Sequence, residues 1–338
     1  MSRAAGSLGL LLLLLLCPRL AAGDTVWPQP PEPARVKFLR SFTGPAELGL
    51  EQGGVLRFFR RLLFGKEPRQ FVRPYGVAVD AEGRRVYVAD PELGAVHAFD
   101  LGAGKYALLR GARKQPLRTP IGVAVDGGGR LFVADAESAL IFVFSPKHRL
   151  LFSFGREQRL ERPTGIAAAG ERVYVTDTAG HRVLVYRIRG SAAEPLFHFG
   201  GRGDAPGQFN YPVDLAVSSD GKVYVNDSLN FRVQVFDAQG KALSSLGRPG
   251  DSSGSFQRSK GVALDSDGNL YVVDALFDTV QIFGPDARFL LNFGRPGAQE
   301  GEFWLPTGLA IDRADRLYVV DSYNRRVQTF QYLKEAGR

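Results

Sequence analysis

The sequence has 338 residues, with 40 glycines, 20 prolines, 24 phenylalanines and a single cysteine, and 44% of its residues are hydrophobic. This composition excludes a disordered chain, a collagen-like chain and a small disulfide scaffold. The formal net charge of +8 at pH 7 suits anionic partners without identifying one. The length fits either two ordinary domains or a single repeat array, and the many Gly and Phe residues indicate short strands joined by tight turns.

Residues 1–23 have the features of a secretory signal peptide. A basic residue, Arg3, precedes a leucine-rich run that is too short to cross a bilayer comfortably, and small residues lead up to Gly23. We therefore expect export to the periplasm or cell envelope, with cleavage after Gly23. Two alternatives remain open: the segment is retained as an anchor, or Cys17 carries a lipid. The position of Cys17 resembles that of a lipoprotein cysteine, although Leu16 stands where a small residue is wanted.

A proline-rich linker is predicted at residues 24–34, which contain four prolines. Such a run favours the extended polyproline II conformation. We expect it to act as a stiff spacer between the signal region and the folded body.

From residue 74 onward the chain repeats at intervals of about 46 residues. Each unit begins with Pro-x-Gly or a degenerate form of it, and an alanine stands two residues after the glycine position. An apolar run ending in Asp follows, then a short strand, then a strand that ends in Phe-Gly or Leu-Gly in most copies. Four short strands in a unit of this length are typical of one blade of a β-propeller. The six units begin at Pro74, Pro120, Pro163, Pro212, Ser259 and Pro306.

The sixth repeat lacks its fourth strand, and a matching strand occurs near the other end of the chain. Residues 37–42 resemble residues 288–293, so the N-terminal strand is expected to complete the last blade and close the ring. The predicted fold is therefore all-β, a six-bladed β-propeller over residues 35–333 with one short helical insertion, followed by a tail at 334–338. We expect it to be a monomer.

Two repeats carry the pattern Asp-Ser-x-Asn-x-Arg-Val-Gln, at 227–234 and at 321–328. Together with the connector from Phe293 to Pro306, they resemble the NHL-repeat family, and the resemblance covers residues 71–333. It implies a six-bladed propeller and leaves the activity open, because one fold carries many functions. Some NHL propellers bind RNA, but we do not expect a nucleic-acid partner for an exported chain.

In three repeats an Asp and an Arg stand five residues apart. We interpret them as structural pairs that hold a turn, with Arg present for its bidentate fork. The pairs are Asp177 with Arg182, Asp227 with Arg232, and Asp321 with Arg326.

Residues 46–70 form an insertion before the first blade. The apolar residues within 54–66 have helical spacing and are interrupted by arginines, which predicts a short basic amphipathic helix. This helix either covers one end of the propeller or contacts an anionic membrane surface or a partner. The candidate contact residues are Arg57, Phe58, Phe59, Arg60, Arg61 and Phe64.

Carboxylates recur just after the first strand of several repeats and could hold calcium in the propeller tunnel. The alternative is that each Asp accepts backbone hydrogen bonds in its own turn, and repetition favours this interpretation. The four histidines share no repeat position, so we expect scattered surface histidines and no zinc cluster. The metal candidates are Asp80, Asp126, Asp214, Asp265 and Asp312.

No phosphate loop or His-Glu-x-x-His motif is present. The sequence therefore predicts an exported, non-enzymatic binding module for a protein or an anionic polymer, without a cofactor. Two alternatives remain: a metal-dependent lyase or hydrolase that uses the tunnel, and a peripheral membrane protein that uses residues 54–66.

Overall fold

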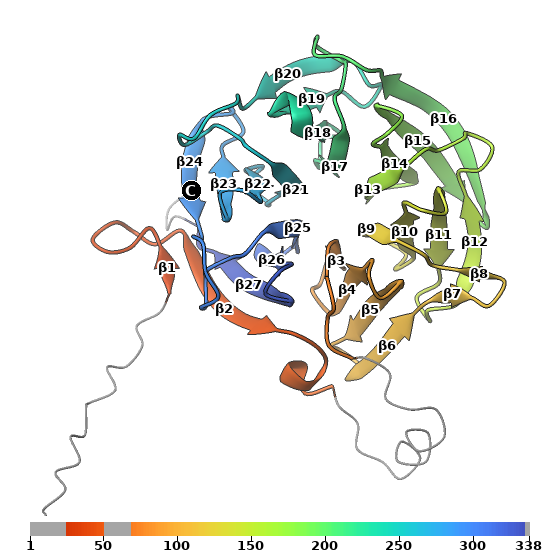
Figure 1. Cartoon of the computed structure of the whole chain (residues 1–338), viewed down its shortest axis with the longest axis horizontal. Helices are drawn as coiled ribbons and strands as arrows, with labels where there is room; N and C mark the ends of the chain where they lie inside the picture. Colours follow the sequence, from red (N-terminus) through yellow and green to blue (C-terminus); the bar gives the residue numbers. More distant parts are fainter. Residues whose placement is uncertain (1–24, 51–68, 335–338) are drawn as a thin grey trace, which may run out of the picture.

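The computed structural model describes residues 25–50 and 69–334, which fold into six four-stranded sheets arranged around an axis (Figure 1). The predicted six-bladed β-propeller is confirmed. Each blade runs outward from its first strand, which faces the axis, to its fourth strand on the rim. No helix in this part of the chain is long and apolar enough to cross a membrane.

The first three blades follow one another in chain order, and a two-stranded hairpin, β7 (Gly111–Ala112) with β8 (Gln115–Pro116), links the first two. Blade 1 comprises β3 (Val77–Val79), β4 (Arg85–Asp90), β5 (Ala95–Asp100) and β6 (Lys105–Leu109). Blade 2 comprises β9 (Pro120–Val125), β10 (Leu131–Asp135), β11 (Leu140–Phe144) and β12 (Leu150–Phe154). Blade 3 comprises β13 (Pro163–Ala169), β14 (Arg172–Asp177), β15 (Arg182–Arg189) and β16 (Ala192–Gly200).

The last three blades complete the ring. Blade 4 comprises β17 (Pro212–Val217), β18 (Val223–Asp227), β19 (Arg232–Phe236) and β20 (Ala242–Leu246), with a 3₁₀ turn η2 (Ser228–Asn230). Blade 5 comprises β21 (Ser259–Leu264), β22 (Leu270–Asp274), β23 (Thr279–Phe283) and β24 (Phe289–Phe293). Blade 6 comprises β25 (Pro306–Ile311), β26 (Arg316–Asp321), β27 (Arg326–Tyr332) and the N-terminal β2 (Val36–Phe42).

The N-terminal strand closes the ring, as predicted. Strand β2 pairs antiparallel with β27, and the short β1 (Val26–Trp27) pairs in turn with β2. The stiff spacer expected at 24–34 does not extend over Val26 and Trp27, because Trp27 packs against Phe293 and Phe330 with ring centroids 5.6 and 5.8 Å away. A large aromatic ring gains more by burial against blades 5 and 6 than in an extended linker.

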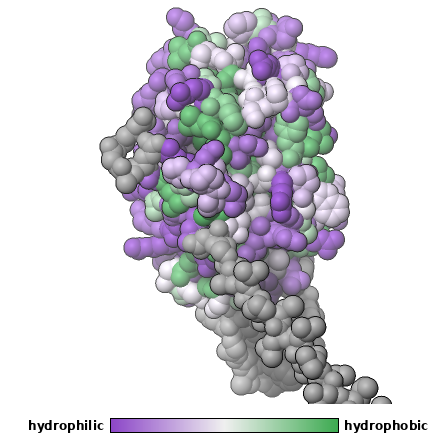
Figure 2. Space-filling view, turned by 90° about the vertical axis from the view of Figure 1, so that its left-hand side faces the viewer, coloured by the Kyte–Doolittle hydropathy of each residue, from purple (hydrophilic) through white to green (hydrophobic). Residues whose placement is uncertain are grey.

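The core is divided into six clusters, each between two neighbouring blades. The second and third strands are buried on both faces, which explains why their sequences are continuously apolar rather than alternating. Figure 2 looks onto the rim of the ring, where apolar surface lies in separate areas among polar side chains. Exposed leucines of the fourth strands, such as Leu290, belong to this rim.

The insertion begins with a 3₁₀ turn, η1 (Ala46–Leu48), and its ends are attached to the ring. Leu50 and Phe71 are buried in the cluster between blades 6 and 1, beside Phe42. Residues 51–68, and with them most of the predicted helix and all six candidate contact residues, lie outside the described residues.

Candidate binding site at the axial channel and the turn face

One face of the propeller collects two kinds of loop from every blade. The first strand of each blade begins opposite the end of the second strand, as where Pro306 pairs with Asp321. The connector that enters a blade and the turn that joins its second and third strands therefore lie on the same face, which we call the turn face. In blade 6 the backbone N–H of Tyr323 donates to the carbonyl of Trp304 at 3.2 Å.

The aspartate that ends each second strand anchors this face. In blade 6, the carboxylate of Asp321 accepts hydrogen bonds from the backbone N–H of Trp304 at 2.8 Å and from Nε of Arg326 at 2.7 Å. Arg326 also donates to three carbonyl groups of the incoming connector. The pairs Asp177–Arg182 and Asp227–Arg232 have the same arrangement. These side chains determine the shape of the turns. Their polar atoms are engaged in these hydrogen bonds.

Blades 1, 2 and 5 lack this arginine, yet their aspartates hold the connector in the same way. Asp90 accepts from the N–H of Val72 at 2.7 Å, Asp135 from the N–H of Arg118 at 2.7 Å, and Asp274 from the N–H of Gln257 at 2.7 Å. The backbone bond is therefore the shared function of the aspartate, and the arginine is an addition in three blades.

The turn face is divided into an apolar part and a charged part. Two residues after the anchoring aspartate, blades 4 to 6 carry exposed Leu229, Leu276 and Tyr323, which are 46 to 51% exposed. Blades 1 and 2 carry Glu92 and Glu137 at that position, each in an ion pair with an arginine of the connector at 3.1 Å.

Two further aromatic side chains extend the apolar part. Trp304, 53% exposed, lies with its ring centroid 5.4 Å from that of Tyr323, and the guanidinium of Arg73 lies 5.6 Å from the Tyr323 ring. Tyr211, on blade 4, is 41% exposed. Exposed large side chains at matching places on neighbouring blades are typical of a protein-binding surface.

The axial channel opens on this face between the starts of the six first strands. Five of these starts carry a glycine that lies against the next blade, and a Cβ at Gly122, for example, would overlap the carbonyl oxygen of Thr164. Only glycine permits such close approach of two backbones. The channel contains a cavity of about 80 Å³. It is large enough for several water molecules or the end of one side chain, and far below the size of a typical small-molecule site.

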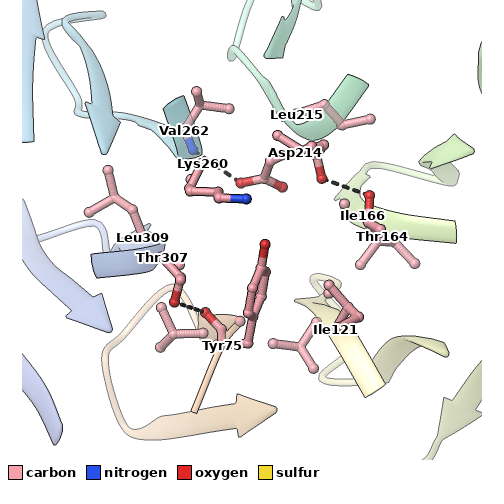
Figure 3. Close-up of a pocket in the computed structure, with 18 residues that line it drawn as sticks. Tyr75, Ile121, Thr164, Ile166, Asp214, Leu215, Lys260, Val262, Thr307 and Leu309 are labelled. Atoms are coloured by element: carbon pink, nitrogen blue, oxygen red, sulfur yellow. Dashed lines mark hydrogen bonds between the residues drawn. The ribbon is translucent and has the colours of Figure 1, made fainter. Parts of the chain in front are cut away.

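Three polar side chains from different blades point toward one another in this cavity: Tyr75, Asp214 and Lys260 (Figure 3). Asp214 occupies the position of the glycine in blade 4, and one of its oxygens accepts a hydrogen bond from the backbone N–H of Val262 at 3.0 Å. The lining residues Thr164 and Thr307 instead donate to carbonyl groups of neighbouring blades.

Burial shifts all three titratable groups. It raises the pKa of Asp214 to about 7, because the backbone hydrogen bonds it accepts offset only part of the loss of hydration. Burial, aided by the positive charges of Arg258 and Arg162, lowers the pKa of Lys260 to about 8. Burial and the neighbouring Asp214 raise the pKa of Tyr75 to about 12. Each group retains partial exposure because it faces the channel.

The structure separates Asp214 from the other proposed calcium ligands. The other four aspartates lie at the far end of their first strands, where each accepts backbone hydrogen bonds within its own hairpin. Among residues 25–50 and 69–334, no group of three or more His, Cys, Asp or Glu side chains could hold a metal ion. These four aspartates are Asp80, Asp126, Asp265 and Asp312.

The expectation of surface histidines is wrong for two of the four. His97 is fully buried in β5, with Nδ1 2.9 Å from the hydroxyl of Tyr106 and Nε2 3.7 Å from Asp90. His181 is also buried and lies 3.1 Å from the carbonyl of Phe209. The third strand and the turn before it pack between blades, so polar rings there are enclosed.

Sequence reasoning did not find Tyr75 and Lys260. Both occupy the middle position of the Pro-x-Gly motif, and this position faces the axis in all six blades. The other four residues at this position are Ile121, Thr164, Val213 and Thr307. The signal was the departure from the repeat: a tyrosine and a lysine stand among small or apolar residues.

The ring of four-stranded blades defines the class of protein as a six-bladed β-propeller. A family model described as "NHL repeat" matches residues 117–144, 160–186, 209–236 and 303–330. The chain is therefore an NHL-repeat propeller, as its repeat motifs indicate.

Three similar proteins illustrate how far the likeness extends. The rat (Rattus norvegicus) E3 ubiquitin-protein ligase NHLRC1 is 34% identical over 88 residues, which are 25% of this chain and 22% of that protein. Human (Homo sapiens) E3 ubiquitin-protein ligase TRIM32 is 49% identical over 45 residues, 13% of this chain and 7% of that protein. The matches thus span less than a quarter of either relative. A solved streptogramin B lyase has a TM-score of 0.58 at 14% identity, covering 77% of this chain and 93% of the lyase, which shows a shared fold.

Proposed function

We propose that this chain is an exported, non-enzymatic binding module that holds a protein partner on its turn face. The observation that carries the proposal is the apolar part of that face, where Trp304, Tyr323 and Leu276 are each about half exposed. Trp and Tyr side chains are enriched among the few interface residues that supply most of the free energy of protein association. The rigid ring beneath them supports the proposal, because little conformational entropy is lost when a partner docks on a preformed surface.

The experiment compares two matched double variants as immobilised bait for proteins of the exported fraction. Trp304→Ser with Leu276→Ser removes exposed apolar area from the turn face. Leu243→Ser with Leu290→Ser removes leucines that are 50 and 43% exposed on the rim strands β20 and β24. We expect the turn-face variant to capture about one tenth of the partner that the wild type captures, or less. The rim variant should capture as much as the wild type. Equal capture by the turn-face variant would contradict the proposal.

Export is a separate part of the proposal and rests on the composition of residues 1–23. Expression with the native N-terminus, followed by N-terminal sequencing of the exported product, tests it. We expect the mature chain to begin at Asp24. A product that retains Met1, or one acylated at Cys17, would replace cleavage by one of the two anchored alternatives.

A further inference from the structure

The side chain of Lys260 places a cation in the channel, and no described residue forms an ion pair with it. Its carbon chain runs along the inner end of β21, and its ammonium group points toward the axis (Figure 3). Among the described residues, the ammonium group makes no hydrogen bond and no ion pair. A buried cation without a partner is costly, since the protein replaces hydration only in part.

The charges nearest to Lys260 are also positive. Arg162 directly precedes β13 and Arg258 directly precedes β21, and both side chains are exposed on the turn face. Their backbone N–H groups are held by the anchoring Asp177 and Asp274, at 2.8 and 3.1 Å. Both arginines act on the pKa of Lys260 and lower it. These positive charges favour an anion at the mouth of the channel.

The remaining groups in the cavity suit a carboxylate. Tyr75 keeps its phenolic proton at every physiological pH, because its pKa is raised to about 12. Asp214 is half protonated near pH 7 and can then donate a hydrogen bond, since its pKa is raised to that value. One ammonium and two hydroxyl donors match the two oxygens of a single carboxylate. The cavity of about 80 Å³ admits the end of one acidic side chain and little more.

We propose that the channel mouth binds the carboxylate of an Asp or Glu side chain that a protein partner inserts between Lys260, Tyr75 and Asp214. The partner rests on the apolar part of the turn face, so this inference deepens the proposed function and rests on it. Lys260 supplies the charge, Arg162 and Arg258 guide the acidic group to the mouth, and Tyr75 and Asp214 orient it.

The test uses a peptide probe, acetyl-Gly-Gly-Asp-Gly-Gly-amide, and its Asn counterpart of the same shape. Both are added to the full-length exported chain at pH 7 during trace acetylation of lysines, and each site is read by mass spectrometry. We expect the Asp peptide to slow acetylation of Lys260 at least about threefold and to leave the acetylation of the exposed Lys105 unchanged, because a bound carboxylate stabilises the unreactive ammonium form. Equal protection by the Asn peptide, or none by either, would overturn the inference.

A second measurement covers the case in which Lys260 does not react. The melting temperature is recorded in sodium acetate and in sodium chloride of equal ionic strength, for the wild type, Lys260→Gln and Lys105→Gln. We expect acetate to raise the melting temperature of the wild type and of Lys105→Gln but not of Lys260→Gln. No difference between the two salts, or an equal rise in Lys260→Gln, would overturn the inference. A larger rise in inorganic phosphate than in acetate would also overturn it, because the site would then not select a carboxylate.

The pH dependence gives an independent readout. Below pH 7 Asp214 is protonated and Lys260 is charged, so the cavity is positive. Above pH 8 Asp214 is charged and Lys260 is neutral, so the cavity repels an anion. Acetate should therefore stabilise the protein at pH 6 and lose its effect by about pH 9. An effect that persists unchanged at pH 9 would place the anion elsewhere, on the exposed arginines.

The failure of this inference is distinguishable from that of the proposed function. If turn-face variants lose the partner but Lys260→Gln binds it as the wild type does, the partner uses the face without inserting a carboxylate. If the Asp peptide protects Lys260 but turn-face variants keep the partner, the pocket exists and the partner binds elsewhere.

Discussion

The backbone N–H of Val262 on blade 5 donates a hydrogen bond of 3.0 Å to a carboxylate oxygen of Asp214 on blade 4. At the position of Asp214 the five other blades have a glycine, which lets the neighbouring backbones approach closely. The joint between blades 4 and 5 is therefore made by a side chain, and within residues 25–50 and 69–334 it is the one joint at which a titratable group connects two blades at the channel.

This joint makes stability depend on pH. Burial raises the pKa of Asp214 from 3.8 to about 7, so between these values the folded state binds more protons than the unfolded state. Its contribution to stability is thus present at low pH and is lost as the pH rises through 7. Asn at 214 cannot ionise. We expect Asp214→Asn to gain about 2 kcal/mol relative to the wild type between pH 5 and pH 8, measured by urea unfolding. A difference that does not change with pH would refute the raised pKa.

The close approach of neighbouring blades predicts that replacing a single glycine at the channel strongly lowers the free energy of unfolding. In Gly122→Ala, the added methyl group would overlap the carbonyl oxygen of Thr164 in the next blade. We expect a loss of about 2 to 3 kcal/mol in the free energy of unfolding, because neither backbone can move without displacing its blade. Gly127→Ala is the control, since no atom lies within 4 Å of a Cβ there. Equal losses in the two variants would show that the blades are less tightly joined than the structure indicates.

The closing strand β2 predicts that two of its own residues contribute very differently to the free energy of unfolding. Phe42 is 2% exposed and packs against Phe71 and Phe99, with ring centroids 5.9 and 5.5 Å away, whereas Leu39 is 43% exposed. Phe42→Ala should cost about 3 to 5 kcal/mol in chemical denaturation, and Leu39→Ala less than about 1 kcal/mol. Similar small effects would mean that the N-terminal strand does not close the ring in solution.

The Asp–Arg pair of blade 6 predicts that a buried ion pair contributes more to the free energy of unfolding than an exposed one. Arg326 has 11% of its side chain exposed and holds both Asp321 and the connector, so Arg326→Ala removes the cation that pairs with a buried carboxylate and the hydrogen bonds to three carbonyl groups. We expect a loss of about 3 to 5 kcal/mol. Arg288→Ala is the control, because Arg288 and Asp286 are more than half exposed, and its cost should be about 0.5 kcal/mol or less. Thermal unfolding of both variants provides the comparison, and a similar loss in each would contradict the anchoring role.

Much of the fold could be predicted from the sequence because the propeller is built from local patterns. Each blade carries its own apolar runs, hairpin glycines and terminal Asp, and repetition of these features shows the number of blades. The missing fourth strand of the last repeat and the matching residues 37–42 likewise predicted the closure, since an unpaired strand edge has to be covered. The placement of Trp27 was not predictable in this way, because its contacts lie on blades at the other end of the chain.

The candidate site was less accessible to sequence reasoning. Asp214 stood out because it replaced a glycine, but it was grouped with four aspartates that serve their own hairpins. Tyr75 and Lys260 were hidden in the variable position of the Pro-x-Gly motif. The burial of His97 was also not predictable from the sequence. It follows from the packing of blades 6 and 1 and not from any pattern around this residue.

The repeat, the number of blades and the closure of the ring follow from the sequence, because each of these depends on hydrogen bonding and burial within or between adjacent strands. The identity of the side chains that share the channel follows from how the blades are arranged in space. Tyr75, Asp214 and Lys260 are far apart in the chain and meet because the first strands of all six blades begin beside one axis. There, low hydration alters their pKa values, and a departure from the repeat becomes a chemically distinct site.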